Sequence, residues 1–105
     1  MRFMLKVNIP VEEGNEAARA GTLASTIKRI MDDLNPEAAY FTDNDGERAC
    51  FFILNLEEAC EIPKVAEPFF LAFNAAVEIH PVMVPEDLEK AGPSIARAVG
   101  QYGRT

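Results

Sequence analysis

The chain has few of the residues on which several kinds of site depend. Its 105 residues include one histidine and two cysteines, Cys50 and Cys60, which are too far apart for a CxxC motif. Two cysteines are too few for the disulfide framework of a small secreted domain, and a single histidine argues against a Cys/His zinc site. We therefore expect a cytoplasmic protein that holds no metal and no cofactor.

Long apolar runs and an excess of positive charge are also missing. No stretch approaches the ~20 apolar residues of a membrane helix, and the opening MRFMLKVNIP alternates instead of forming the continuous apolar run of a signal peptide. Acidic residues outnumber basic ones 17 to 10, which gives a formal net charge of −7. Such a domain does not attract phosphate backbones, so we expect neither a nucleic acid nor a membrane as partner.

The composition is that of a single folded domain covering residues 1–105, with 49% hydrophobic and 26% charged residues. Its first segment alternates with period two, because Phe3, Leu5, Val7 and Ile9 occupy odd positions between more polar residues. This pattern predicts a half-buried strand that ends before Pro10. One helix should follow, capped by Asn15 and ending at Asn35-Pro36.

The middle of the chain predicts a β-hairpin over 38–42 and 48–56. If Asp45 and Gly46 are the two central turn residues, Tyr40 lies opposite Phe51. A one-residue shift would exchange the two faces of the hairpin.

Two helical segments and a strand complete the predicted order. A short turn at 57–61 precedes a helix from about Pro63 to 73, and an alternating strand over 75–84 contains Pro81, which favours the edge of a sheet. The tail from Pro85 is predicted to be helical, with Leu88 and Ala91 buried and an interruption at Gly92-Pro93. The sequence leaves open whether the segment after Gly92 packs on its own sheet or on a partner subunit.

The order β-α-β-β-α-β-α predicts an α+β, ferredoxin-like sandwich with a four-stranded antiparallel sheet of order 4-1-3-2 and an extra C-terminal helix. The helices should cover one face of the sheet. Residue parity then assigns ten side chains to the open face: Met4, Lys6, Asn8, Tyr40, Thr42, Phe51, Ile53, Glu78, His80 and Val82. This set is too apolar for a water-exposed surface, so we expect a homodimer through this face with a cleft between the two sheets.

With this layout, the opening MRFMLKVNIP and the tail VEIHPVMVPEDLEKA resemble short uncharacterised bacterial proteins of the dimeric α+β barrel superfamily. The resemblance implies a dimer. The superfamily includes cofactor-independent monooxygenases, muconolactone isomerase-like enzymes, haem-degrading enzymes, chlorite dismutase-like proteins and ligand-binding domains of transcription regulators. This range means that the fold alone assigns no function.

Two hypotheses for the open face follow. In the first, a homodimer without catalytic turnover binds a small apolar or partly oxygenated ligand beside Lys6, Asn8, Tyr40 and Phe51. In the second, a cofactor-independent isomerase or monooxygenase uses His80 as general base with Glu78 beside it, while Lys6 or Asn8 stabilises an oxyanion. The structural alternative is a cross-strand Lys6–Glu78 ion pair, with His80 as a hydrogen-bonded interface residue.

Overall fold

A computed structural model describes residues 1–104, and its centre is a four-stranded antiparallel sheet. The strands are β1 (Arg2–Ile9), β2 (Ala38–Asn44), β3 (Glu47–Asn55) and β4 (Ala76–Pro81). Their order, β2-β3-β1-β4, is the predicted 4-1-3-2 order read from the other edge. The α+β architecture is therefore confirmed and is consistent with a ferredoxin-like fold. Pro81 ends the edge strand β4, where its missing N–H costs no ladder hydrogen bond.

The crossover after β1 contains two helices, α1 (Val11–Ala20) and α2 (Leu23–Leu34), so the single predicted helix is wrong. Gly21 separates them with φ 74°, a left-handed conformation that ends α1 and that glycine adopts without strain. The cap assigned to Asn15 is also wrong, because α1 begins directly after Pro10. Asn15 instead lies inside α1, where its Oδ1 accepts a hydrogen bond from Arg48 Nη1 (3.0 Å).

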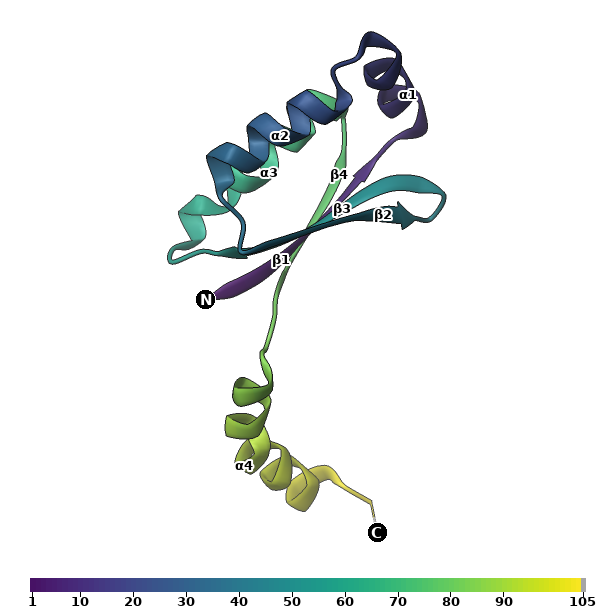
Figure 1. Cartoon of the computed structure of the whole chain (residues 1–105). Helices are drawn as coiled ribbons and strands as arrows, with labels where there is room; N and C mark the ends of the chain where they lie inside the picture. Colours follow the sequence, from purple (N-terminus) through teal and green to yellow (C-terminus); the bar gives the residue numbers. More distant parts are fainter. Residues whose placement is uncertain (105) are drawn as a thin grey trace.

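The second crossover agrees with prediction. A short 3₁₀ turn, η1 (Ala59–Glu61), leads into α3 (Ile62–Phe73). The Glu61 carboxylate accepts hydrogen bonds from the backbone amides of Glu58 and Glu57, both at 2.8 Å, and these bonds lower the pKa of Glu61. Figure 1 shows α2 and α3 side by side over one face of the sheet. The predicted one-sided covering is thus present in these two helices.

The core lies between the sheet and these two helices. Its largest fully buried side chains are Phe52, Phe69, Leu5, Ile9 and Val7. The ring of Phe52 on β3 stacks on that of Phe69 on α3, with ring centroids 5.5 Å apart. Phe41 of β2 packs edge-on against Phe52 at 6.1 Å and shares its side of the sheet, but it remains 56% exposed because β2 is an edge strand.

The C-terminal helix α4 (Pro85–Tyr102) departs from the prediction in two ways. It runs without a break through Gly92-Pro93. Glycine before proline has no Cβ to collide with the proline ring, which removes part of the usual barrier to helix at that position. Leu88 is 53% exposed and Ala91 only half-buried, because α4 projects away from the sheet and its two covering helices (Figure 1). The molecule is accordingly elongated, with extents of 59 × 29 × 21 Å.

Candidate functional site

The uncovered face of the sheet carries the residues that the sequence analysis selected. The register pairs Tyr40 with Phe51, Phe51 with Lys6, and Lys6 with Glu78. These four residues therefore form one row across β2, β3, β1 and β4. The Asp45-Gly46 turn that sets this register has φ values of 53° and 78°, as a two-residue type I′ hairpin requires. The predicted hairpin register is confirmed.

A second row lies beside the first and is mainly apolar. Met4 of β1 pairs with Ile53 of β3 on one side and with His80 of β4 on the other. Met4, Phe51 and Ile53 are half-buried in the isolated chain, and Tyr40 is 62% exposed. The aromatic and aliphatic side chains of this face thus gather over β2, β3 and Met4 of β1, and the ionisable ones, which we call the charged half, lie over β1 and β4.

Three side chains form the charged half. Lys6 Nζ lies 3.3 Å from Glu78 Oε2, and His80 Nε2 lies 3.3 Å from Glu78 Oε1. The hydrogen bond from Lys6, followed by the contact with His80, lowers the pKa of Glu78. Glu78 is therefore a carboxylate at neutral pH, suited to accept hydrogen bonds and to orient the His80 ring. The cross-strand ion pair considered from sequence is present.

Asn8 is held by the end of the hairpin. It is 8% exposed, and its Nδ2 donates to the Asn44 carbonyl (3.1 Å) and to Glu47 Oε1 (3.2 Å). Its Oδ1 accepts from Asn44 Nδ2 at 3.3 Å. Both amide hydrogens are thus engaged within the chain, so Asn8 fastens β1 to the hairpin. Lys6, two residues earlier on β1, has a side chain that is 22% exposed.

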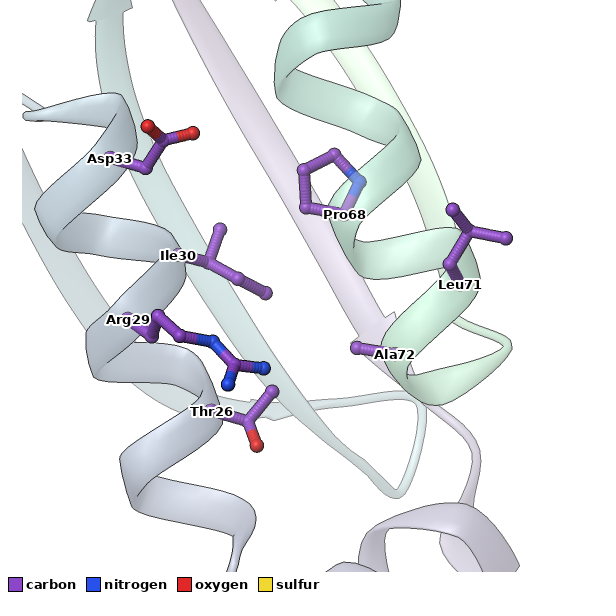
Figure 2. Close-up of a pocket in the computed structure, with 7 residues that line it drawn as sticks. All are labelled: Thr26, Arg29, Ile30, Asp33, Pro68, Leu71 and Ala72. Carbon is purple, nitrogen blue, oxygen red and sulfur yellow. The ribbon is translucent and has the colours of Figure 1, made fainter.

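A groove that the sequence analysis did not identify lies on the helical side, between α2 and α3. Figure 2 shows Arg29, Ile30 and Asp33 of α2 facing Pro68 and other residues of α3. The space between them has a volume of about 520 Å³. The two walls of the groove are distant in sequence, so no short motif indicates it. Arg29 and Asp33, four residues apart, have the spacing of a solvated helix face. The polar side chains of this groove all come from α2, so it lacks convergent polar groups from both walls and is a weaker ligand site.

The structure describes residues 1–104. Among these residues no three His, Cys, Asp or Glu side chains cluster in a way that could hold a metal ion. Within the same part of the chain, no helix has the length and apolar character needed to cross a membrane.

Comparison with known proteins bears on family and not on activity. A search of curated proteins finds no match to this chain. The domain of unknown function DUF3303 matches residues 1–96, which include every strand and the first two-thirds of α4. A match of this extent covers the sheet, the open face and the start of the projecting helix. The chain therefore belongs to the family of the domain of unknown function DUF3303.

Proposed function

We propose that the chain forms a two-fold homodimer through the open face of its sheet and binds a small apolar or partly oxygenated molecule in the cleft between the two sheets. The observation that carries this proposal is the row Tyr40–Phe51–Lys6–Glu78, with Met4 and Ile53 beside it. Partly exposed aromatic and aliphatic side chains grouped on one face are typical of an interface or a ligand groove.

The two halves of the face favour self-association. If the two-fold axis runs along the strands, β4 of one chain lies opposite β2 of the other, since these are the two sheet edges. Tyr40 of each chain then approaches the Glu78–His80 pair of its partner. Packed sheets stand about 10 Å apart, which leaves room for a ligand where the facing side chains are short. The resemblance to dimeric α+β barrels supports a sheet-to-sheet dimer.

The residues that face the cleft indicate the chemistry of its ligand. Phe51, Ile53 and Met4 would contact an apolar body, while Lys6 and His80 would bind an oxygen function such as a carbonyl, phenol or carboxylate. Lys6 is the stronger anchor for an anionic oxygen because its charge is partly buried.

A cofactor-independent isomerase or monooxygenase is the second candidate. The observation that favours it is the 3.3 Å contact between His80 Nε2 and Glu78 Oε1, an imidazole beside an ionised carboxylate that could orient it as a general base. His80 is 51% exposed in the single chain and is therefore accessible to a substrate. Turnover that is lost in His80→Gln, with ligand binding retained, would favour this candidate over simple binding.

The dimer is tested by light scattering and native mass spectrometry of the purified chain. We expect a mass near twice 11.6 kDa. Tyr40→Glu, which places a carboxylate opposite the partner's Glu78, should weaken association at least tenfold, a loss of about 1.4 kcal/mol or more. Ser25→Glu, at an exposed residue of α2 and with the same change in charge, is the matched control. A wild-type chain that stays monomeric at micromolar concentration would overturn the proposal.

Binding in the cleft is tested with the fluorescent probe 1-anilinonaphthalene-8-sulfonate, which joins an apolar body to an anionic oxygen group. The folded wild-type dimer should bind the probe and Tyr40→Glu should bind it more weakly, while circular dichroism confirms that both are folded. Equal binding by the two proteins would place the probe elsewhere, for example in the groove between α2 and α3.

A further inference from the structure

α4 is an amphipathic helix whose apolar side is not covered. Leu88, Ile95, Val99 and Tyr102 recur at helical spacing and are 53%, 52%, 63% and 81% exposed. We call these four residues the apolar stripe of α4. Glu86, Lys90 and Arg97 lie on the opposite side of the helix by the same spacing. The pattern is that of a helix with a surface to bury, but none of its residues is buried in the single chain.

The dimensions of the chain show how much surface α4 leaves open. A compact protein of this mass has about 5,800 Å² of accessible surface, whereas this chain has 7356 Å². The radius of gyration is 17.6 Å, against about 13 Å for a compact domain of this length. The excess of about 1,500 Å² per chain exceeds the roughly 800 Å² that each partner contributes to a standard protein interface.

The helix has weak support of its own. Gly92, Pro93 and Gly100 all lie inside α4 and disfavour an isolated helix in water. Its first turn is nevertheless well defined, because the Val84 amide donates to Asp87 Oδ2 at 3.1 Å. On the sheet side, the Val82 amide donates to the Arg2 carbonyl at 3.1 Å. A short connection that is hydrogen-bonded at both ends therefore directs α4 away from the sheet. Because its sequence disfavours an isolated helix, we expect α4 to be stabilised by packing against another surface.

A matching apolar groove lies on the opposite edge of the molecule. It runs between α2 and β2, offers about 290 Å³ of space, and is lined by Leu23, Ala24, Ile27, Lys28, Met31 and Phe41. Its lining is almost entirely apolar, and Phe41 is 56% exposed within it. Lys28 is the one charged residue of the lining, and it is paired with Asp32 of the same helix at 3.0 Å. We call this space the α2–β2 groove.

We propose that α4 is an exchanged arm, whose apolar stripe packs into the α2–β2 groove of a second copy of the chain while the groove of its own chain receives the partner's arm. Both surfaces belong to the same sequence, so a two-fold pair satisfies each of them twice. The mostly uncharged contact also suits two chains that each carry −7, since it brings few acidic groups together. The partner need be nothing other than a second copy.

The position of the groove argues against packing within one chain. The groove borders β2, three strand spacings of about 4.8 Å from β4 across the sheet. α3, which contacts β4, lies on the same side of the sheet between them. Only residues 82–84 join β4 to α4, and they span at most about 11 Å. A second copy is not subject to this limit, because its groove can approach the apolar stripe where α4 stands clear of its own sheet (Figure 1).

The exchange goes beyond the proposed function, because two sheets can associate without exchanged arms. It is tested in the full-length chain with two matched pairs of variants, each adding one positive charge. Ile95→Lys places lysine in the apolar stripe and Gln101→Lys places it elsewhere on α4. Ala24→Lys blocks the groove, and Ser25→Lys alters the neighbouring exposed residue of α2. We expect the first member of each pair to weaken dimerisation at least tenfold and its control to change it less than threefold.

Mixing the two disrupted variants distinguishes exchange from packing within a chain. In a heterodimer of Ile95→Lys and Ala24→Lys, the intact arm of the second chain meets the intact groove of the first, which restores one of the two contacts. We expect the mixture to form heterodimers, resolved by native mass spectrometry, at concentrations where each variant alone is monomeric. Failure of the mixture to associate more tightly than its components would overturn the exchange. A dimer that depends on Tyr40 but is indifferent to Ile95 and Ala24 would overturn the exchange and leave the sheet dimer standing. A wild-type monomer would overturn both.

Discussion

The sheet with its two covering helices and the projecting helix α4 have similar apolar patterns but very different burial. Phe69 on α3 and Ile95 on α4 both lie on the apolar side of an amphipathic helix, and they are 0% and 52% exposed. α3 lies against a sheet face that presents Phe52, whereas α4 has no surface of its own chain beneath it. Helical periodicity thus identifies the side of a helix to be buried and does not identify its partner.

The largest expected effect is in the core. Phe69→Ala removes a fully buried ring stacked on Phe52 and should lower the free energy of unfolding by about 3–5 kcal/mol. Ile95→Ala in dilute, monomeric protein should change it by less than about 0.5 kcal/mol, as at other exposed positions. Urea unfolding followed by circular dichroism measures both. Equal losses at the two positions would show that α4 is as tightly packed as α3.

The next effect depends on pH and again separates the two regions. Burial raises the pKa of the Cys50 thiol from 9.0 to about 11. The folded state therefore retains a proton that the unfolded chain loses. The contribution of the protonated Cys50 thiol to the free energy of unfolding is complete below pH 9 and is lost as the pH rises towards 11. Between pH 9 and pH 11 the free energy of unfolding of the wild type should fall by about 2 kcal/mol relative to that of Cys50→Ala. Urea unfolding at several pH values measures this difference. A constant difference would show that the Cys50 thiol is not desolvated.

Glycine substitutions give a smaller contrast. Gly46, in the hairpin turn, has φ 78°, and Gly46→Ala should cost about 1–2 kcal/mol because a Cβ is strained there. Gly100 of α4 has open space around it, so Gly100→Ala should leave the free energy of unfolding unchanged or raise it by less than about 0.5 kcal/mol. Thermal melts of the two variants measure this contrast. A destabilising Gly100→Ala would mean that the helix packs closely at that residue.

The smallest effect belongs to the charged half of the open face. Glu78→Gln should leave the unfolding midpoint at pH 7 almost unchanged, since the ion pair with Lys6 is solvent-exposed on the glutamate side. The pKa of Glu78 lies below its ordinary value of 4.5. Any contribution of the Glu78 carboxylate to the free energy of unfolding is therefore present above pH 4.5 and is lost as the pH falls further. Wild type and variant should therefore converge in acid. Divergence in acid would contradict the assigned direction of the pKa shift.

Much of the sheet could be predicted from local sequence. Alternation in residues 3–9 predicts the first strand, and the Asp45-Gly46 turn predicts the register of the hairpin. Pro81 predicts the edge position of β4. The open-face residues follow from that register, because side chains alternate between the two faces of a strand. Local chemistry was insufficient at Gly21, a left-handed residue that divides the one predicted helix into two.

The sequence by itself determined the element types, the strand order and which side chains share the open face, since these depend on periodicity and turn chemistry within short segments. Only the tertiary structure decided that Asn8 is engaged by Asn44 and Glu47, that Phe41 stays exposed at the sheet edge, and that α4 projects away from the sheet. Each of these depends on residues far apart in the chain. Burial is a property of the surface that a side chain meets, and the pattern of a single segment does not contain that surface.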